Sequence, residues 1–244
     1  LAQGGVMREG AVALRLGLPG IPAEAESVVV ARDVALARAT GARVHLAHLS
    51  TADSVRIVAE AKAAGVPVTA EVTPHHLFLT EEALDGFDPS AKVNPPLGSA
   101  EDRQALRGAL ADGVIDVVAS DHAPHAAEEK ACELDQAPFG AVGLETMLAL
   151  VLGELVRDGT LSPLQAVRAV TLNPVRVLGL PGGRLAEGEV ADITLFDPGR
   201  EWVVDPDRFQ SRGRNTPFAG WKLKGRPVGT IVGGTIVMLD GELA

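Results

Sequence analysis

The first half of this chain alternates between segments with helical periodicity and segments with strand periodicity. Strands that follow one another through helices and short links form parallel sheets covered by helices. The chain is therefore predicted to have an α/β fold, although three such strands are too few to close a barrel by themselves. The apolar spacing predicts strands over residues 43–49, 66–72 and 115–120, and helices over residues 23–40, from Thr51 to Gly65, and from Ser99 to residue 111.

The second half has a different pattern. Residues 140–180 have helical periodicity, and Ser162-Pro163 is typical of the start of a helix. Beyond Gly183 the chain is predicted to form a small β module, with strands at residues 190–196, 202–204 and 228–239 and a hairpin turn at Gly233-Gly234. We therefore expect two domains, an α/β domain over residues 1–182 and a β module over residues 183–244.

Composition excludes several classes of protein. The formal net charge of −10 argues against a surface for nucleic acid or anionic membranes. No apolar run approaches the roughly 20 residues that span a bilayer. Cys132 is the only cysteine and cannot form an internal disulfide, which fits a reducing compartment and a cytoplasmic location.

Candidate catalytic residues stand at the ends of two predicted strands, where parallel α/β folds assemble their active sites. His48 ends one strand, and Asp121 follows another. With a side-chain period of two, His48 lies on one face of its strand and His45 on the other. An imidazole and a carboxylate at one rim suit a divalent ion such as zinc. Spacing alone leaves open that the two residues are only helix caps or loop residues with hydrogen bonds.

Two further segments could contact a ligand. Asp121 and His125 surround a tight bend at Pro124, and Asn94 stands in a proline-rich loop that could aim its amide at a ligand, although a simple turn residue is an equally ordinary interpretation. For His75 and His76 the preferred interpretation is packing behind the site.

Six motifs occur in a fixed order along essentially the whole chain. They are His48-Leu49-Ser50-Thr51, residues 71–77, Asn94-Pro95-Pro96-Leu97, residues 120–125, Pro138-Phe139-Gly140 and residues 215–221. Together they resemble the type I dihydroorotases of the amidohydrolase superfamily. The resemblance implies the later strands of a metal-dependent, TIM-type (β/α)8 barrel followed by part of a small β-sandwich module.

The resemblance also implies a role for individual residues. His48 would be a metal ligand at the end of the sixth barrel strand, and Asp121 would both bind metal and transfer the proton. Asn94 and His125 would hold the substrate, and the backbone of Phe139 and Gly140 would contact its ring. A complete site would contain two zinc ions.

The chain departs from the family pattern at its beginning. It has no His-x-His pair, no arginine after such a pair, and neither the carboxylate of the fourth strand nor the histidine of the fifth. We therefore expect a fragment or a processed chain that opens just after the fifth strand and is inactive by itself.

The expected activity is that of a zinc-dependent dihydroorotase, the reversible hydrolysis of dihydroorotate to N-carbamoyl-L-aspartate in pyrimidine biosynthesis. Related cyclic amidases (hydantoinase, dihydropyrimidinase, allantoinase) are the close alternative. A non-catalytic scaffold for aspartate transcarbamoylase is a third, although such scaffolds lose metal ligands that this chain keeps. The expected partners are the small-molecule substrate, a second copy in a homodimer, or aspartate transcarbamoylase.

Overall fold

The computed structural model describes all 244 residues, which divide into two compact units. Unit 1 comprises residues 1–143 and 206–217, and unit 2 comprises residues 144–205 and 218–244. The expected domain boundary at residue 182 stays a prediction. No helix is both long enough and apolar enough to cross a membrane.

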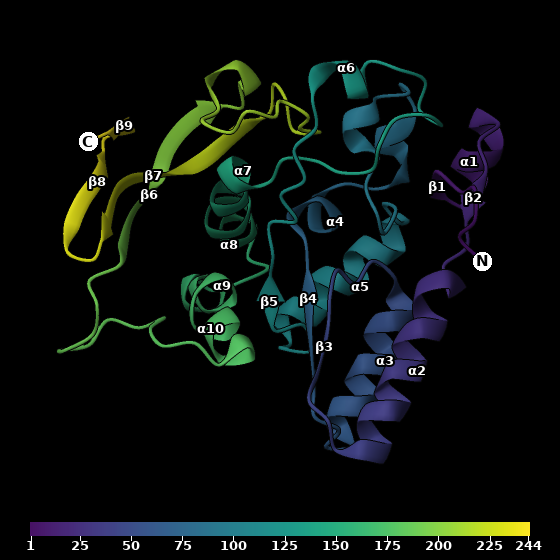
Figure 1. Cartoon of the computed structure of the whole chain (residues 1–244), viewed down its shortest axis with the longest axis horizontal. Helices are drawn as coiled ribbons and strands as arrows, with labels where there is room; N and C mark the ends of the chain where they lie inside the picture. Colours follow the sequence, from purple (N-terminus) through teal and green to yellow (C-terminus); the bar gives the residue numbers. More distant parts are fainter. The chain divides into compact units, whose positions relative to one another are not determined.

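Unit 1 contains the predicted parallel sheet, in the order β3-β4-β5 (Figure 1). The three strands are shorter than the apolar runs that predict them: β3 is Val44–Leu46, β4 is Val68–Val72 and β5 is Val117–Val118. The long helices of this unit are α2 (Glu24–Thr40), α3 (Ala52–Ala63) and α5 (Ala100–Ala111), at the predicted positions. The prediction of a βαβ-type unit is confirmed.

Local capping explains where these helices begin and end. The Thr51 hydroxyl accepts the backbone N–H of Ser54 at 3.1 Å, and Ser99 forms a capping box with Asp102. Gly41 ends α2 in the left-handed conformation, with φ of 72°. Apolar residues of the helices and the sheet then form the core, including Val58, Leu106, Ala70 and Val72, all almost completely buried.

The remaining elements of unit 1 are short. They are β1 (Met7–Arg8), α1 (Ala11–Leu16), β2 (Gly20–Ile21), α4 (Pro74–Phe78), η1 (Glu81–Leu84), η2 (Pro89–Ala91), α6 (Ala127–Lys130) and η4 (Pro206–Arg208). β1 and β2 form a separate two-stranded parallel sheet.

Unit 2 combines helices with one antiparallel sheet of order β6-β7-β8-β9. The Gly233-Gly234 turn is where the sequence predicts it, between β7 and β8. The two strands predicted at residues 190–196 and 202–204 are wrong in detail, because β6 is a single strand whose pairing with β7 is interrupted by bulges. The elements are α7 (Leu144–Leu148), the π-helical turn η3 (Ala149–Glu154), α8 (Leu155–Arg157), α9 (Pro163–Val170), α10 (Leu172–Leu178), β6 (Ile193–Val203), β7 (Lys222–Val232), β8 (Thr235–Leu239) and β9 (Glu242–Leu243).

Candidate active site

His48 and Asp121 are brought together just beyond the ends of β3 and β5. His48 Nε2 lies 3.7 Å from Asp121 Oδ1. Both residues have a left-handed backbone, with φ of 55° and 45°, and they are two of only four non-glycine residues that do so in the chain. Such conformations are uncommon for residues with a Cβ and gather at functional sites. The backbone therefore supports a functional interpretation of this pair.

Glu71 on β4 completes the surroundings of His48. Its Oε1 lies 2.9 Å from His48 Nδ1, and its Oε2 lies 3.1 Å from His45 Nε2. The prediction that His45 and His48 lie on opposite sides is therefore wrong. The alternation of side chains ends with β3 at Leu46, and the left-handed backbone of His48 turns its ring back toward the same carboxylate.

The contacts of Glu71 also shift pKa values in this cluster. Burial by itself would raise the pKa of Glu71, but the imidazoles of His45 and His48 outweigh it and lower the value to about 2. The Glu71 carboxylate in turn raises the pKa of His48, against the effect of burial. Burial raises the pKa of Asp121, with an opposing effect of His48. A carboxylate at Nδ1 of His48 leaves Nε2 directed at Asp121, the arrangement found in metal-binding histidines.

His75 and His76 are buried on α4, as expected for packing residues. His76 bonds to the Thr73 hydroxyl and to the Pro95 carbonyl. His75 differs, because its buried Nε2 has no hydrogen-bond partner and lies 3.6 Å from Asp121 Oδ2. His75 therefore lies next to the carboxylate of Asp121.

A second cluster joins the predicted substrate-holding residues His125, Phe139 and Gly140. Nε2–H of His125 donates to the Phe139 carbonyl at 2.9 Å. Gly140 has φ of 133°, and a Cβ there would meet the Cβ of Ala123 at 2.6 Å. The backbone at residues 139–140 therefore lies directly against the bend that follows Asp121.

Asn94 belongs to a loop beside this cluster. The loop is held by the Arg8 guanidinium, which donates to the Pro96 carbonyl at 3.2 Å, and by the bond from His76 to Pro95. Asn94 lines a cavity of about 300 Å³, together with Arg8, Glu26 and His45. His48 and Asp121 are not among the residues that line this cavity.

The sequence profile of the amidohydrolase family matches residues 6–237, nearly the whole chain. This chain belongs to the amidohydrolase family. Members of the family are metal-dependent hydrolases.

Within this family, the chain is most usefully compared with two curated dihydroorotases. The chain is 63% identical over 240 residues to a dihydroorotase of Pelotomaculum thermopropionicum, and 55% identical over 240 residues to one of Anaeromyxobacter dehalogenans. The matches cover 98% of this chain but only 56% and 55% of those proteins, so the chain spans about half the length of these relatives. The resemblance to dihydroorotases, predicted from the six motifs, is confirmed.

Solved structures of a hydantoinase and a dihydropyrimidinase have a fold similar to that of this chain. An L-hydantoinase from Arthrobacter aurescens is 33% identical with a TM-score of 0.85, and the match covers 89% of this chain and 49% of that one. A dihydropyrimidinase from Brevibacillus agri is 27% identical with a TM-score of 0.88, covering 100% of this chain and 53% of that one. The metal-dependent hydrolase fold expected of the chain is confirmed at this level.

The geometry of His48 and Asp121 can be compared with what a metal ion requires. No group of three or more His, Cys, Asp and Glu side chains is arranged to hold an ion. The 3.7 Å between His48 Nε2 and Asp121 Oδ1 is too long for a hydrogen bond. It is short enough for both atoms to reach one zinc ion at about 2 Å each. The two residues present therefore fit a metal, but they are fewer than a complete ligand set.

Acid is expected to destabilise the fold of this amidohydrolase through His76. Its ring is satisfied as a neutral group, because Nε2–H donates to Pro95 at 2.9 Å and Nδ1 accepts from Thr73 at 2.7 Å. Burial lowers the pKa of His76 from 6.5 to about 4. The unfolded chain takes up a proton near the higher value and the folded chain does not. The free energy of unfolding therefore falls as the pH drops from about 6.5 toward about 4.

We expect His76 to account for a loss of about 2 kcal/mol between about pH 7 and about pH 5. Urea denaturation of the wild type and of His76→Gln over this range measures it, since all other buried groups are common to both proteins. The variant should lose less stability with acid than the wild type. Equal losses in the two proteins would show that His76 is not held neutral.

Proposed function

We propose that this chain is the carboxy-terminal part of a zinc-dependent dihydroorotase, which interconverts dihydroorotate and N-carbamoyl-L-aspartate in pyrimidine biosynthesis. The observation that carries the proposal is the left-handed pair His48 and Asp121, 3.7 Å apart, in a chain 63% identical to a dihydroorotase. In this proposal β3, β4 and β5 are the sixth, seventh and eighth strands of a (β/α)8 barrel. The sheet of unit 2 is one layer of a small β-sandwich.

Asp121 performs the proton transfer in the proposed reaction. Zinc, when bound by His48, Asp121 and ligands from the rest of the polypeptide, would supply Lewis-acid chemistry and activate water. Asp121 accepts the proton of the attacking water and delivers it to the departing ring nitrogen. Glu71 stays ionised and keeps Nε2 of His48 directed at Asp121.

The substrate is held by groups on three segments in this proposal. His125 and Asn94 orient the ring and its carboxylate, and the backbone at Phe139 and Gly140 contacts the ring. Orientation of this kind accounts for a large part of enzymatic rate enhancement, and small displacements are costly. The hydrogen bond that joins His125 to Phe139 is therefore part of the proposed mechanism.

Two other functions compete with this proposal. The solved neighbours include a hydantoinase and a dihydropyrimidinase, which favours a related cyclic amidase as the alternative. The kept residues His48 and Asp121 argue against a non-catalytic scaffold. The deciding experiment compares turnover of dihydroorotate, hydantoin and dihydrouracil by this chain completed with the amino-terminal part of the Pelotomaculum relative. Faster turnover of hydantoin or dihydrouracil would overturn the dihydroorotase proposal, and no turnover at all would favour a scaffold.

The isolated chain is expected to bind zinc poorly and to be inactive, because it presents only two of the ligands of the proposed site. The completed protein is expected to retain two zinc ions per chain. Metal analysis after dialysis of both proteins, side by side, measures the difference. Two tightly bound zinc ions in the isolated chain would contradict the expectation.

We further propose a cytoplasmic enzyme that acts on a small molecule and has no nucleic-acid or membrane partner. Its net charge of −10 and single cysteine support this assignment. A homodimer or a complex with aspartate transcarbamoylase is the proposed assembly. Size determination of the completed protein, alone and with aspartate transcarbamoylase, tests it.

A further inference from the structure

Asn215 is a buried residue whose side chain joins two loops of the candidate site. Its amide nitrogen donates to the carbonyl oxygens of Ala123 and Gly140, both at 3.0 Å. Its Oδ1 accepts the backbone N–H of His125, also at 3.0 Å. The residue is only 6% exposed. Both donors of the amide and its acceptor are thus used on backbone groups of the segments 123–125 and 139–140.

We propose that Asn215 is a positioning residue that fixes the separation between His125 and the backbone of Phe139 and Gly140. The inference rests on the proposed function, in which these groups hold the substrate from two sides. The bond from the His125 ring to the Phe139 carbonyl connects the same two segments. Asn215 holds the backbone on each side of that bond, so the ring and the carbonyl meet without either loop having to move.

The main chain around Asn215 also packs against the loops that its side chain joins. A Cβ at Gly213 would meet the Cβ of Pro124 at 2.6 Å, so the backbone at Gly213 runs directly against the bend between Asp121 and His125. The carbonyl of Asn215 also accepts the N–H of Val142 at 2.9 Å. The side chain and the main chain of Asn215 therefore both hold the segment that contains Gly140.

Only an amide satisfies all three partners. Aspartate has the same shape, but it would direct an acceptor at two carbonyl oxygens and lose both donated bonds. Alanine would leave the carbonyls of Ala123 and Gly140 and the N–H of His125 without this partner. In both variants the distance between the two loops should therefore no longer be fixed. In Asn215→Asp the cause is repulsion between the carboxylate and the two carbonyl oxygens, because the volume of the side chain hardly changes.

The experiment uses the completed enzyme and compares Asn215→Ala and Asn215→Asp with the wild type and with Ser99→Ala. Ser99 caps α5 through Asp102, so its loss lowers stability without touching either loop. We expect kcat/KM for dihydroorotate to fall by about a hundredfold in both Asn215 variants, with zinc content unchanged. Ser99→Ala should retain kcat/KM at temperatures below its unfolding midpoint.

A second readout does not depend on turnover. Hydrogen exchange at the backbone amide of His125 should be at least about tenfold faster in Asn215→Ala than in the wild type, because the acceptor of that amide is gone. An unchanged kcat/KM, a loss that Ser99→Ala shares, or an unchanged exchange rate at His125 would each overturn the inference. If the wild type fails to turn over dihydroorotate, the proposed function fails, and hydrogen exchange still tests the link that Asn215 makes.

Discussion

Replacing Asp121 by Asn is expected to lower the turnover of dihydroorotate by about a thousandfold or more, the upper part of the range for removing an acid–base group. Asparagine keeps the shape of the side chain but cannot carry a proton between water and the ring nitrogen. It also weakens the contact with His48, which lies 3.7 Å away. The measurement is kcat and kcat/KM of the completed enzyme, with the zinc content of both proteins determined in parallel.

Asp116→Asn is the matched control for this prediction. Asp116 stands just before β5, whereas Asp121 lies just beyond it. The Asp116 carboxylate accepts the Lys62 ammonium at 2.6 Å and the N–H of Ala70 at 2.8 Å. Its replacement should reduce stability and leave kcat within a few-fold of the wild type. Comparable activity in Asp121→Asn and Asp116→Asn, with full zinc content in both, would contradict the assigned role of Asp121.

Local features of the fold could be predicted from the sequence because their causes are local. Thr51 and Ser99 cap helices through residues three positions away, and Gly41 ends α2 by adopting a conformation that other residues rarely adopt. Such features depend on a few neighbouring residues and need no knowledge of the tertiary structure. The parallel sheet is different, because it pairs distant residues such as Val44 with Val68 and Glu71 with Val117, and it was predicted from the order of strands and helices along the chain.

The surroundings of the site could not be predicted in the same way. Asn215 is 92 residues from Ala123 and 75 from Gly140 in the sequence, so no periodicity connects them. Glu71 was missed as a partner of His48, although its place on the less buried face of β4, just before the strand ends, is a signal that could have suggested it. The face of His48 was also predicted wrongly, because strand periodicity does not reveal a left-handed residue.

The burial of two lysines, Lys92 and Lys130, also could not be predicted from the sequence. Lys92 and Lys130 are nearly inaccessible, and their ammonium groups donate to backbone carbonyls, those of Leu134 and Asp135 from Lys92 and those of Pro89 and Pro138 from Lys130. Burial, with a contribution from the neighbouring Lys92, lowers the pKa of Lys130 to about 8. A lysine is ordinarily predicted to face solvent, and only the folded chain supplies the carbonyl oxygens that allow its burial.

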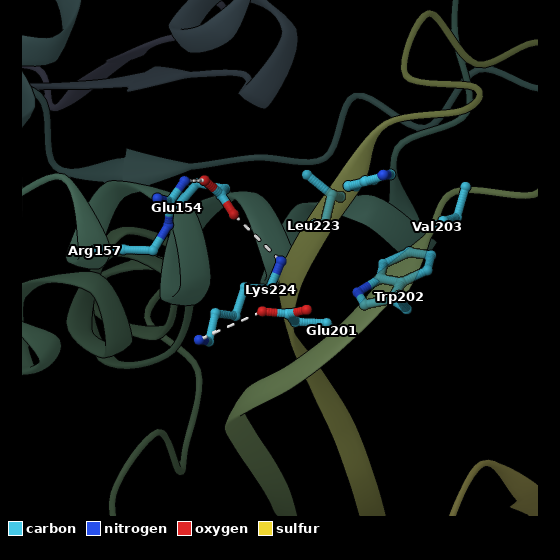
Figure 2. Close-up of a pocket in the computed structure, with 8 residues that line it drawn as sticks. Glu154, Arg157, Glu201, Trp202, Val203, Leu223 and Lys224 are labelled. Carbon is cyan, nitrogen blue, oxygen red and sulfur yellow. Dashed lines mark hydrogen bonds and ion pairs between the residues drawn. The ribbon is translucent and has the colours of Figure 1, made fainter.

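In unit 2, Gly153→Ala is expected to destabilise the fold by about 3 kcal/mol or more, at or beyond the usual upper range for overpacking. Gly153 lies in the π-helical turn η3, and a Cβ there would meet the backbone carbonyl oxygen of Lys224 at 1.8 Å. The next residue bonds to the same strand, since Glu154 Oε1 accepts the N–H of Lys224 at 3.2 Å. Figure 2 shows Glu154 directed at Lys224, with Arg157 beside it. The three residues line a cavity of about 580 Å³.

A methyl group at Gly153 must therefore move the helix away from β7 or displace the strand. Either movement breaks the bond between Glu154 and Lys224. Because β7 is central in its sheet, with β6 on one side and β8 on the other, a displaced β7 disturbs both pairings. The effect should thus spread through unit 2.

Gly108→Ala is the matched control, because Gly108 lies inside α5 and a Cβ there would meet nothing within 4 Å. This substitution should stabilise the chain by about 0.5 to 1 kcal/mol, since alanine loses less backbone entropy in a helix. Urea denaturation of the three proteins measures both effects, and they should have opposite signs. If Gly153→Ala stayed within about 1 kcal/mol of the wild type, the helix and β7 could not be in backbone contact, because a shift of that size is too small for a blocked contact of this kind.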